Sequence, residues 1–176
     1  MIHVVVPAFD EAGNIAAAIV GIRQRVEPLG LPHRIVVVDD GSTDGTAEAC
    51  RAHSEPARPV EVHVHPRNLG PGAAFRTGFL HVLRGADPLD VVLTLEANST
   101  SDPSVLMRML HRVWEEGDDI VLASCYLYGG GIKGTRPQRV ALSQEPNGLM
   151  KKPLGLSGLS TLSSFYRLYQ VSARQA

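Results

Sequence analysis

The 176-residue sequence predicts an α/β fold, in which a mostly parallel sheet carries helices on both faces. Short apolar runs alternate along the chain with segments that have the spacing of amphipathic helices. Most of these runs are apolar on both strand faces, as expected for strands that helices cover on both sides. Ligands of such folds lie beyond the carboxyl ends of the strands, near a topological switch point.

Five strands are expected from the apolar runs, at residues 2–7, 34–40, 60–65, 90–96 and 119–124. The third alternates apolar and polar residues, which places it nearer an edge of the sheet. Three of the strands lead into Pro7–Glu11, Asp39–Asp44 and Glu96–Thr100. We expect these segments to converge on one crevice.

Helices are expected between the strands. Asn14 is a suitable cap for the first, whose apolar residues are Ile15, Ile19, Ile22 and Val26. A short polar helix follows residues 41–46, and a third helix covers 72–84. The fourth begins at Asp102-Pro103, a cap followed by proline in the first turn. Its buried residues are expected to be Leu106, Met109, Leu110 and Val113.

Composition indicates a soluble globular protein, with 44% apolar and 20% charged residues. Two cysteines predict no disulfide framework, and a reducing compartment is expected. The first residues do not resemble a signal peptide, and no apolar run is long enough to span a membrane. A cytoplasmic location follows as an expectation.

Charge is unevenly distributed, with a net charge of −7 over residues 1–119 and +6 over residues 120–176. This asymmetry suggests a cation or hydroxyl-rich ligand for the first part and an anion, such as a diphosphate or a lipid headgroup, for the second. The alternative is that the basic part is simply solvated.

Several motifs can be excluded. The sequence has no P-loop, and GPGAAF (70–75) lacks the third glycine of a dinucleotide-binding turn. STDGT (42–46) has serine where a haloacid dehalogenase needs its nucleophilic aspartate. His63 and His65 could face one way from a strand as metal ligands do, but no third ligand is close in sequence, which favours an ordinary strand face.

Four segments occur in a characteristic order and spacing: VVVPAFDEAGNI, VVVDDGSTDGT, RNLGPGAAFRTGF and TLEANSTSDP. Together they resemble family 2 glycosyltransferases of the GT-A (Rossmann-like) fold, especially dolichyl- and polyprenyl-phosphate sugar synthases. ASCYLYGGGIKG and LSTLSSFYRLY are also similar to segments of that branch. The resemblance covers nearly the whole chain.

The resemblance implies a set of nucleotide-sugar-binding residues. In it, Glu11 would accept hydrogen bonds from ribose hydroxyls, and Asp40 would read N–H groups of the base. Spacing alone equally allows Asp39 and Asp40 to cap the next helix. The full set is Pro7, Ala8, Phe9, Glu11, Val38, Asp39, Asp40, Arg67, Gly72 and Ala97.

At the end of the fourth strand, the family usually carries a DxD motif that binds Mg²⁺ or Mn²⁺ together with the donor diphosphate. The matching residues here are Glu96 and Asn98. Glutamate remains a hard anionic ligand, whereas asparagine offers a neutral carbonyl oxygen. We therefore expect a weakened Mg²⁺ or Mn²⁺ site, and Glu96, Asn98 and Arg167 are the candidate catalytic residues. The alternative is that Glu96 and Asn98 are strand-end polar residues without an ion.

Other positions depart from the family pattern. Cys125 and Gln144 replace arginines, and Thr161 replaces an aspartate. The lost arginines would have held phosphates. Basic residues elsewhere could compensate, namely Lys133, Arg136, Arg139, Lys151 and Lys152.

The resemblance implies transfer of a sugar, with inversion, from a nucleoside-diphosphate sugar to a polyprenyl- or dolichyl-type phosphate at the inner membrane face, without nucleic acid. Residues 1–125 would bind the donor, and 126–176 would form the acceptor side of the same domain; a chain truncated relative to the family is a further alternative. The alternatives are a catalytically weak sugar-nucleotide-binding protein and a transferase with another acceptor. Nucleotide, sugar and oligomeric state stay open.

Overall fold

The computed structural model describes residues 1–97, 103–124 and 164–172. The predictions made for Asn98, Asp102, Cys125 and residues 126–163 lie outside these ranges. Within them, six strands form one sheet in the order β3-β2-β1-β4-β6-β5. The strands are β1 (Ile2–Ala8), β2 (His33–Asp39), β3 (Val60–Val64), β4 (Val91–Thr94), β5 (Ile120–Leu122) and β6 (Arg167–Gln170).

All five expected strands are present, and β3 lies at an edge of the sheet as its alternating pattern predicts. The central strand β1 pairs in parallel with both β2 and β4. The chain passes from β1 to β2 and β3 on one side, whereas β4 lies on the other side. The switch point is therefore at the carboxyl ends of β1 and β4.

The strand β6 was not predicted from the sequence. It pairs antiparallel with β4, so that Thr94 lies opposite Arg167 and Val91 opposite Gln170. It separates β4 from β5, and the Gln170 N–H donates to the Asp119 carbonyl at 2.9 Å. This pairing places Arg167 beside the carboxyl end of β4.

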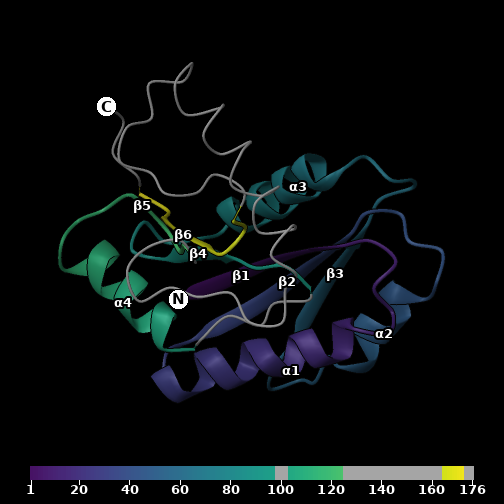
Figure 1. Cartoon of the computed structure of the whole chain (residues 1–176), viewed down its shortest axis with the longest axis horizontal. Coiled ribbons are helices and arrows are strands. Elements are labelled where there is room, and N and C mark those ends of the chain that lie inside the picture. Colours follow the sequence, from purple (N-terminus) through teal and green to yellow (C-terminus); the bar gives the residue numbers. More distant parts are fainter. Residues whose placement is uncertain (98–102, 125–163, 173–176) are drawn as a thin grey trace, which may run out of the picture. The chain divides into compact units, whose positions relative to one another are not determined.

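Helices cover both faces of the sheet, as expected (Figure 1). The helix α3 packs on β1 and β2 from one face, while α1 and α2 lie together on the other. The bounds are α1 (Ile15–Val26), the 3₁₀ helix η1 (Glu27–Leu29), α2 (Thr46–Ala52), α3 (Pro71–Leu83) and α4 (Pro103–Trp114). No helix among the described residues is both long and apolar enough to cross a membrane.

The predicted core residues of α1 and α4 are buried, which confirms the periodicity of both helices. The expected capping role of Asn14 is wrong in detail. Asn14 occupies the N-cap position of α1 without a side-chain capping bond. Its side-chain amide donates instead to Glu11 Oε2 at 2.8 Å, so the loop before the helix uses that side chain.

The contact between α3 and the sheet depends on a glycine. A Cβ atom built on Gly78 would lie 2.4 Å from Val5 Cγ1, in the buried cluster that also includes Val36, Val82 and Val92. Interiors are packed too densely to absorb such an overlap without movement. Gly78 therefore sets the distance between α3 and the central strand.

We predict that Gly78→Ala destabilises the chain. Overpacking costs about 1–3 kcal/mol, and the better helix propensity of alanine, about 1 kcal/mol, only partly offsets it. Urea unfolding should show a lower midpoint. Gly72→Ala is the matched control, because Gly72 also lies in α3 and a Cβ there meets nothing within 4 Å. Equal stability of the two variants would contradict this role for Gly78.

Candidate functional site

The carboxyl ends of the parallel strands bring three predicted segments together. Ala8 at the end of β1 is in register with Asp39 at the end of β2. The Asp40 N–H donates to the Ala8 carbonyl at 2.8 Å, and the His65 N–H donates to the Asp39 carbonyl at 2.8 Å. The residues that follow β1, β2 and β3 therefore lie next to one another at this edge.

The loops after β1 and β2 are held together by reciprocal hydrogen bonds. The Asp10 N–H donates to Ser42 Oγ at 2.9 Å, and the Thr43 N–H donates to Asp10 Oδ1 at 3.1 Å. Asp10 has φ of 52°, a left-handed conformation that aspartate tolerates better than most residues. Asp10 thus links the two loops that are predicted to contact the nucleotide.

Asp44 and Thr46 add a second connection between the same loops. Asp44 Oδ2 accepts the Ala12 N–H at 2.9 Å, and Asp44 Oδ1 accepts the Thr46 hydroxyl at 2.5 Å. Thr46 Oγ1 in turn accepts the Glu11 N–H at 2.9 Å. The GSTDGT segment therefore fixes the backbone of Glu11 before any ligand is present.

Asp40 connects β2 to the loop that precedes α3. Its buried carboxylate accepts the Leu69 N–H at 3.0 Å and the Gly70 N–H at 2.7 Å, and it contacts His65 Nδ1 at 2.6 Å. Burial raises the pKa of the Asp40 carboxyl, but the hydrogen bonds from His65, Leu69 and Gly70 outweigh burial and lower the pKa below its usual value. These hydrogen bonds therefore stabilise the ionised form of the Asp40 side chain.

His65 extends this network to α3. Its Nε2 atom lies 2.9 Å from Thr77 Oγ1. In the tautomer that carries its proton on Nδ1, His65 donates to Asp40, and Nε2 accepts a hydrogen bond from the Thr77 hydroxyl. Both ring nitrogens are then satisfied. His65 is therefore part of a hydrogen-bonded connection from β2 to α3, and no metal ligand role is needed to explain it.

The loop after β2 lies close to the loop after β3, and this close approach requires Gly41. Its φ is +79°, and a Cβ there would lie 2.4 Å from the backbone carbonyl carbon of Arg67. A side chain at this position would separate the loop after β2 from the loop after β3. Arg67 itself is exposed, as is Gly72 at the start of α3.

The other predicted donor residues differ in accessibility. Phe9 is 44% exposed, whereas Ala8, Val38 and Asp39 are buried. Asp39 Oδ1 accepts the Ser42 N–H at 2.9 Å, a turn contact of the kind that the alternative reading of this carboxylate expects. Pro7 and Glu11 are half-buried. Ligand contact by these residues stays a prediction.

At the end of β4, the Leu95 N–H donates to the Val5 carbonyl at 3.3 Å, which keeps this strand beside β1. Glu96 is exposed and Ala97 is buried. Arg167 is half-buried and lies opposite Thr94 on β4. Thr94 is two residues before Glu96 in the sequence. The structure thus places Glu96, after the carboxyl end of β4, and Arg167, at the amino end of β6, at the same edge of the sheet.

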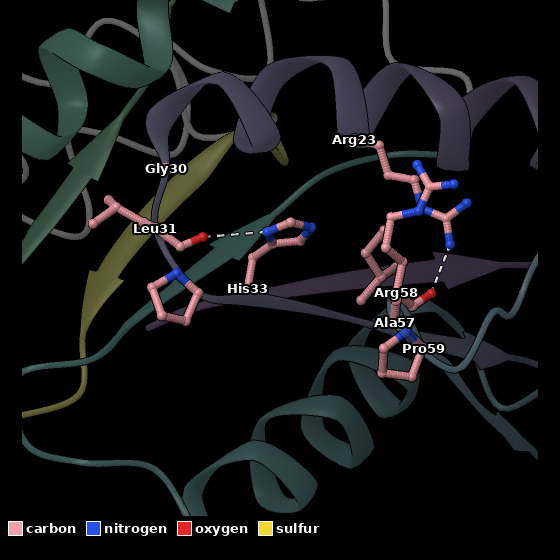
Figure 2. Close-up of a pocket in the computed structure, with 9 residues that line it drawn as sticks. Arg23, Gly30, Leu31, His33, Ala57, Arg58 and Pro59 are labelled. Carbon is pink, nitrogen blue, oxygen red and sulfur yellow. Dashed lines mark hydrogen bonds between the residues drawn. The ribbon is translucent and has the colours of Figure 1, made fainter.

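A separate cavity of about 330 Å³ lies at the amino end of β2. Figure 2 shows Arg23, Arg58 and His33 around it, with the Arg23 guanidinium donating to the Arg58 carbonyl at 2.7 Å. It shares no residue with the predicted donor site, because the latter lies at the opposite ends of the strands.

Sequence reasoning missed five residues that organise the site. Each is polar and lies in a loop, next to a strand end or at the first residue of α2, and each bonds to a segment distant in sequence. The only available signal was the density of polar residues in GSTDGT and the histidine that ends the third apolar run. The five are Asp10, Ser42, Asp44, Thr46 and His65.

We predict that Asp40→Asn destabilises the chain by about 2 kcal/mol at pH 6–7, because an amide group would face two N–H donors. The stabilisation by Asp40 is present above its unfolded pKa, near 3.8, and is lost as pH falls through the lower folded value. Urea unfolding should therefore show a gap between wild type and variant that narrows below about pH 4. Glu48→Gln, at a 75% exposed side chain, is the control and should show no gap.

The chain matches the family model described as glycosyl transferase family 2 over residues 3–175. A polyprenol monophosphomannose synthase from Mycolicibacterium smegmatis is 34% identical over 169 residues, which are 95% of this chain and 60% of that protein. An undecaprenyl-phosphate 4-deoxy-4-formamido-L-arabinose transferase from Edwardsiella ictaluri is 29% identical over 179 residues, with 99% and 50% covered. The chain therefore spans 50 to 60% of the length of these relatives.

Solved structures show the same fold. Mannosyl-3-phosphoglycerate synthase from Rubrobacter xylanophilus has a TM-score of 0.69 at 22% identity, over 97% of this chain and 53% of that one. Glucosyl-3-phosphoglycerate synthase from Mycobacterium tuberculosis, in complex with Mn²⁺, UDP and glucosyl-3-phosphoglycerate, has a TM-score of 0.64 at 19% identity, over 97% and 57%. These likenesses confirm the expected GT-A fold. The match to the family model over residues 3–175 establishes that the chain belongs to glycosyl transferase family 2.

Proposed function

We propose that this chain binds a nucleoside-diphosphate sugar and transfers the sugar, with inversion, to a polyprenyl-type phosphate. The main support is the 34% identity, over 95% of the chain, to a relative named polyprenol monophosphomannose synthase. The second relative is also named for a polyprenyl phosphate, undecaprenyl phosphate. A lipid acceptor implies peripheral contact with the membrane, at its cytoplasmic face.

The nucleoside would bind at the edge where the loops after β1, β2 and β3 meet. Phe9 and Arg67 are exposed there, and both belong to the predicted set. Glu11 has one carboxylate oxygen bonded to Asn14, which leaves its other oxygen for a ribose hydroxyl. The backbone that carries Glu11 is already fixed by Thr46, so little ordering accompanies binding.

The family metal would be held by Glu96 with Asn98. Glu96 is an exposed carboxylate at the end of β4, and a carboxylate with an amide carbonyl is a suitable oxygen donor set for Mg²⁺ or Mn²⁺. When bound, the ion would neutralise charge on the leaving diphosphate. Arg167, at the start of the neighbouring strand β6, would pair with a phosphate.

The phosphate acceptor simplifies the chemistry that the protein must perform. An acceptor phosphate oxygen attacks the anomeric carbon, the bond from that carbon to the diphosphate oxygen breaks, and the nucleoside diphosphate leaves. Because the second pKa of a phosphate monoester is about 6, the attacking oxygen is already anionic near neutral pH. The protein needs no general base, so alignment and charge neutralisation suffice.

We predict that one of UDP and GDP binds with micromolar affinity, and only when Mn²⁺ is present. Calorimetric titration of the chain with each nucleotide, with and without Mn²⁺, measures this directly. Glu96→Ala should weaken the metal-dependent binding at least tenfold, because the anionic ligand is lost. Glu48→Ala, an exposed glutamate on α2, is the matched control and should bind like wild type.

Two other outcomes separate the alternatives. Binding that ignores both Mn²⁺ and Glu96→Ala would remove the metal role and leave metal-free transfer or a binding protein. Absence of binding by either nucleotide would contradict the donor site itself.

A further prediction concerns pH. With a matching sugar donor and a short polyprenyl phosphate, the transfer rate at low acceptor concentration should rise through about pH 6 and then level off, following ionisation of the acceptor. The matching polyprenol without phosphate should give no product. A rate that climbs steadily to pH 9 would contradict this prediction, because it would show that a group other than the acceptor phosphate controls the transfer.

A further inference from the structure

Three metal-ligating side chains meet where the edge strand β3 faces α3. Glu61 and His63 are two residues apart on β3, so they point to the same face, and His81 approaches them from α3. One ligand atom from each residue lies within 4.8 Å of those of the other two. The His63 and His81 rings are 4.1 Å apart between centroids.

The His63 side chain has an unsatisfied nitrogen. Its Nε2 atom is buried and has no hydrogen-bond partner, although buried polar atoms are nearly always paired. Imidazole nitrogens are common metal ligands, so a buried ring nitrogen without a partner is available for coordination.

We propose that Glu61, His63 and His81 form a binding site for a borderline divalent metal ion, with Zn²⁺ as the best fit. Two imidazoles and one carboxylate are a common ligand set for such ions. With metal–nitrogen bonds of about 2.0–2.1 Å, tetrahedral ligand atoms lie about 3.3 Å apart. The three ligand atoms lie within 4.8 Å of one another, so side-chain rotation would have to bring them closer, and water would complete the coordination.

The surroundings both orient and weaken the site. His81 Nε2 lies 2.5 Å from Glu61 Oε2, so these two groups are already aligned, and the ion would replace the shared proton. Arg34 lies 3.5 Å from Glu61 Oε1 and holds the carboxylate in place. The positive charges of Arg34 and Arg84 act on the cluster and oppose a cation, so we expect micromolar affinity.

This site is distinct from the family metal position at Glu96. The oxygen donors there favour Mg²⁺ or Mn²⁺, whereas imidazoles favour Zn²⁺. The inference does not depend on the proposed transfer reaction. A bound ion would join β3 to α3 across the connection that carries Arg67 and Gly70, and would thereby stiffen that loop.

The test is Zn²⁺ titration of EDTA-treated, desalted chain, in competition with a chromophoric chelator. We expect one Zn²⁺ per chain with micromolar affinity, at least tenfold weaker binding for His63→Gln and for His81→Gln, and no change for His111→Gln. His111 is the matched control, since it is a 65% exposed histidine on α4. Saturating Zn²⁺ should raise the Tm of wild type and of the control by about 5 °C.

Unchanged affinity in both His63→Gln and His81→Gln would overturn the proposal, as would wild-type affinity weaker than about 1 mM. X-ray absorption of the Zn²⁺-loaded wild type tests it without any variant. Two imidazoles at about 2.0–2.1 Å support the site, whereas a sulfur ligand or an all-oxygen shell excludes it. Mn²⁺-dependent nucleotide binding should be unchanged in His81→Gln, which keeps this test separate from that of Glu96.

Discussion

The buried carboxylate of Asp40 is the interaction on which the arrangement of the site depends. It receives hydrogen bonds from Leu69 and Gly70 and contacts His65, which in turn reaches Thr77 on α3. A buried charge is tolerated only when such partners surround it. The three partners lie in the segment between β3 and α3, and His65 continues the network to α3. Satisfying one carboxylate therefore fixes this segment and α3 relative to the end of β2.

This constraint bears on how Asp40 can contact a ligand. Its two oxygens already have partners within the chain, although a carboxylate offers about four acceptor positions. A base N–H would therefore have to share an oxygen with a backbone N–H. In the proposed complex, the same carboxylate would hold the loop and also recognise a base, and the loop it holds carries exposed Arg67. Ordering of this loop and the proposed nucleotide recognition would then depend on the same side chain.

Local patterns predicted what local forces decide. Strands β1 to β5 and the buried faces of α1 and α4 follow from apolar periodicity, because side-chain burial determines both. The strand β6 was missed because its four residues form a strand only by pairing with β4, more than 70 residues earlier. The bonds of Asp10 and Asp44 were missed for the same reason, since their partners are specified by strand register. Periodicity contains no information about such pairings.

If Glu96 and Asn98 hold the metal as proposed, the nucleotide must help to hold it. Glu96 would supply one negative charge, and Arg167, at the start of the antiparallel strand β6, would oppose any cation nearby. Without a second carboxylate, the protein alone offers weak attraction to a divalent ion. A diphosphate brings further anionic oxygens and also pairs with the arginine. Metal and nucleotide binding should therefore be strongly cooperative, because each supplies the charge that the other lacks.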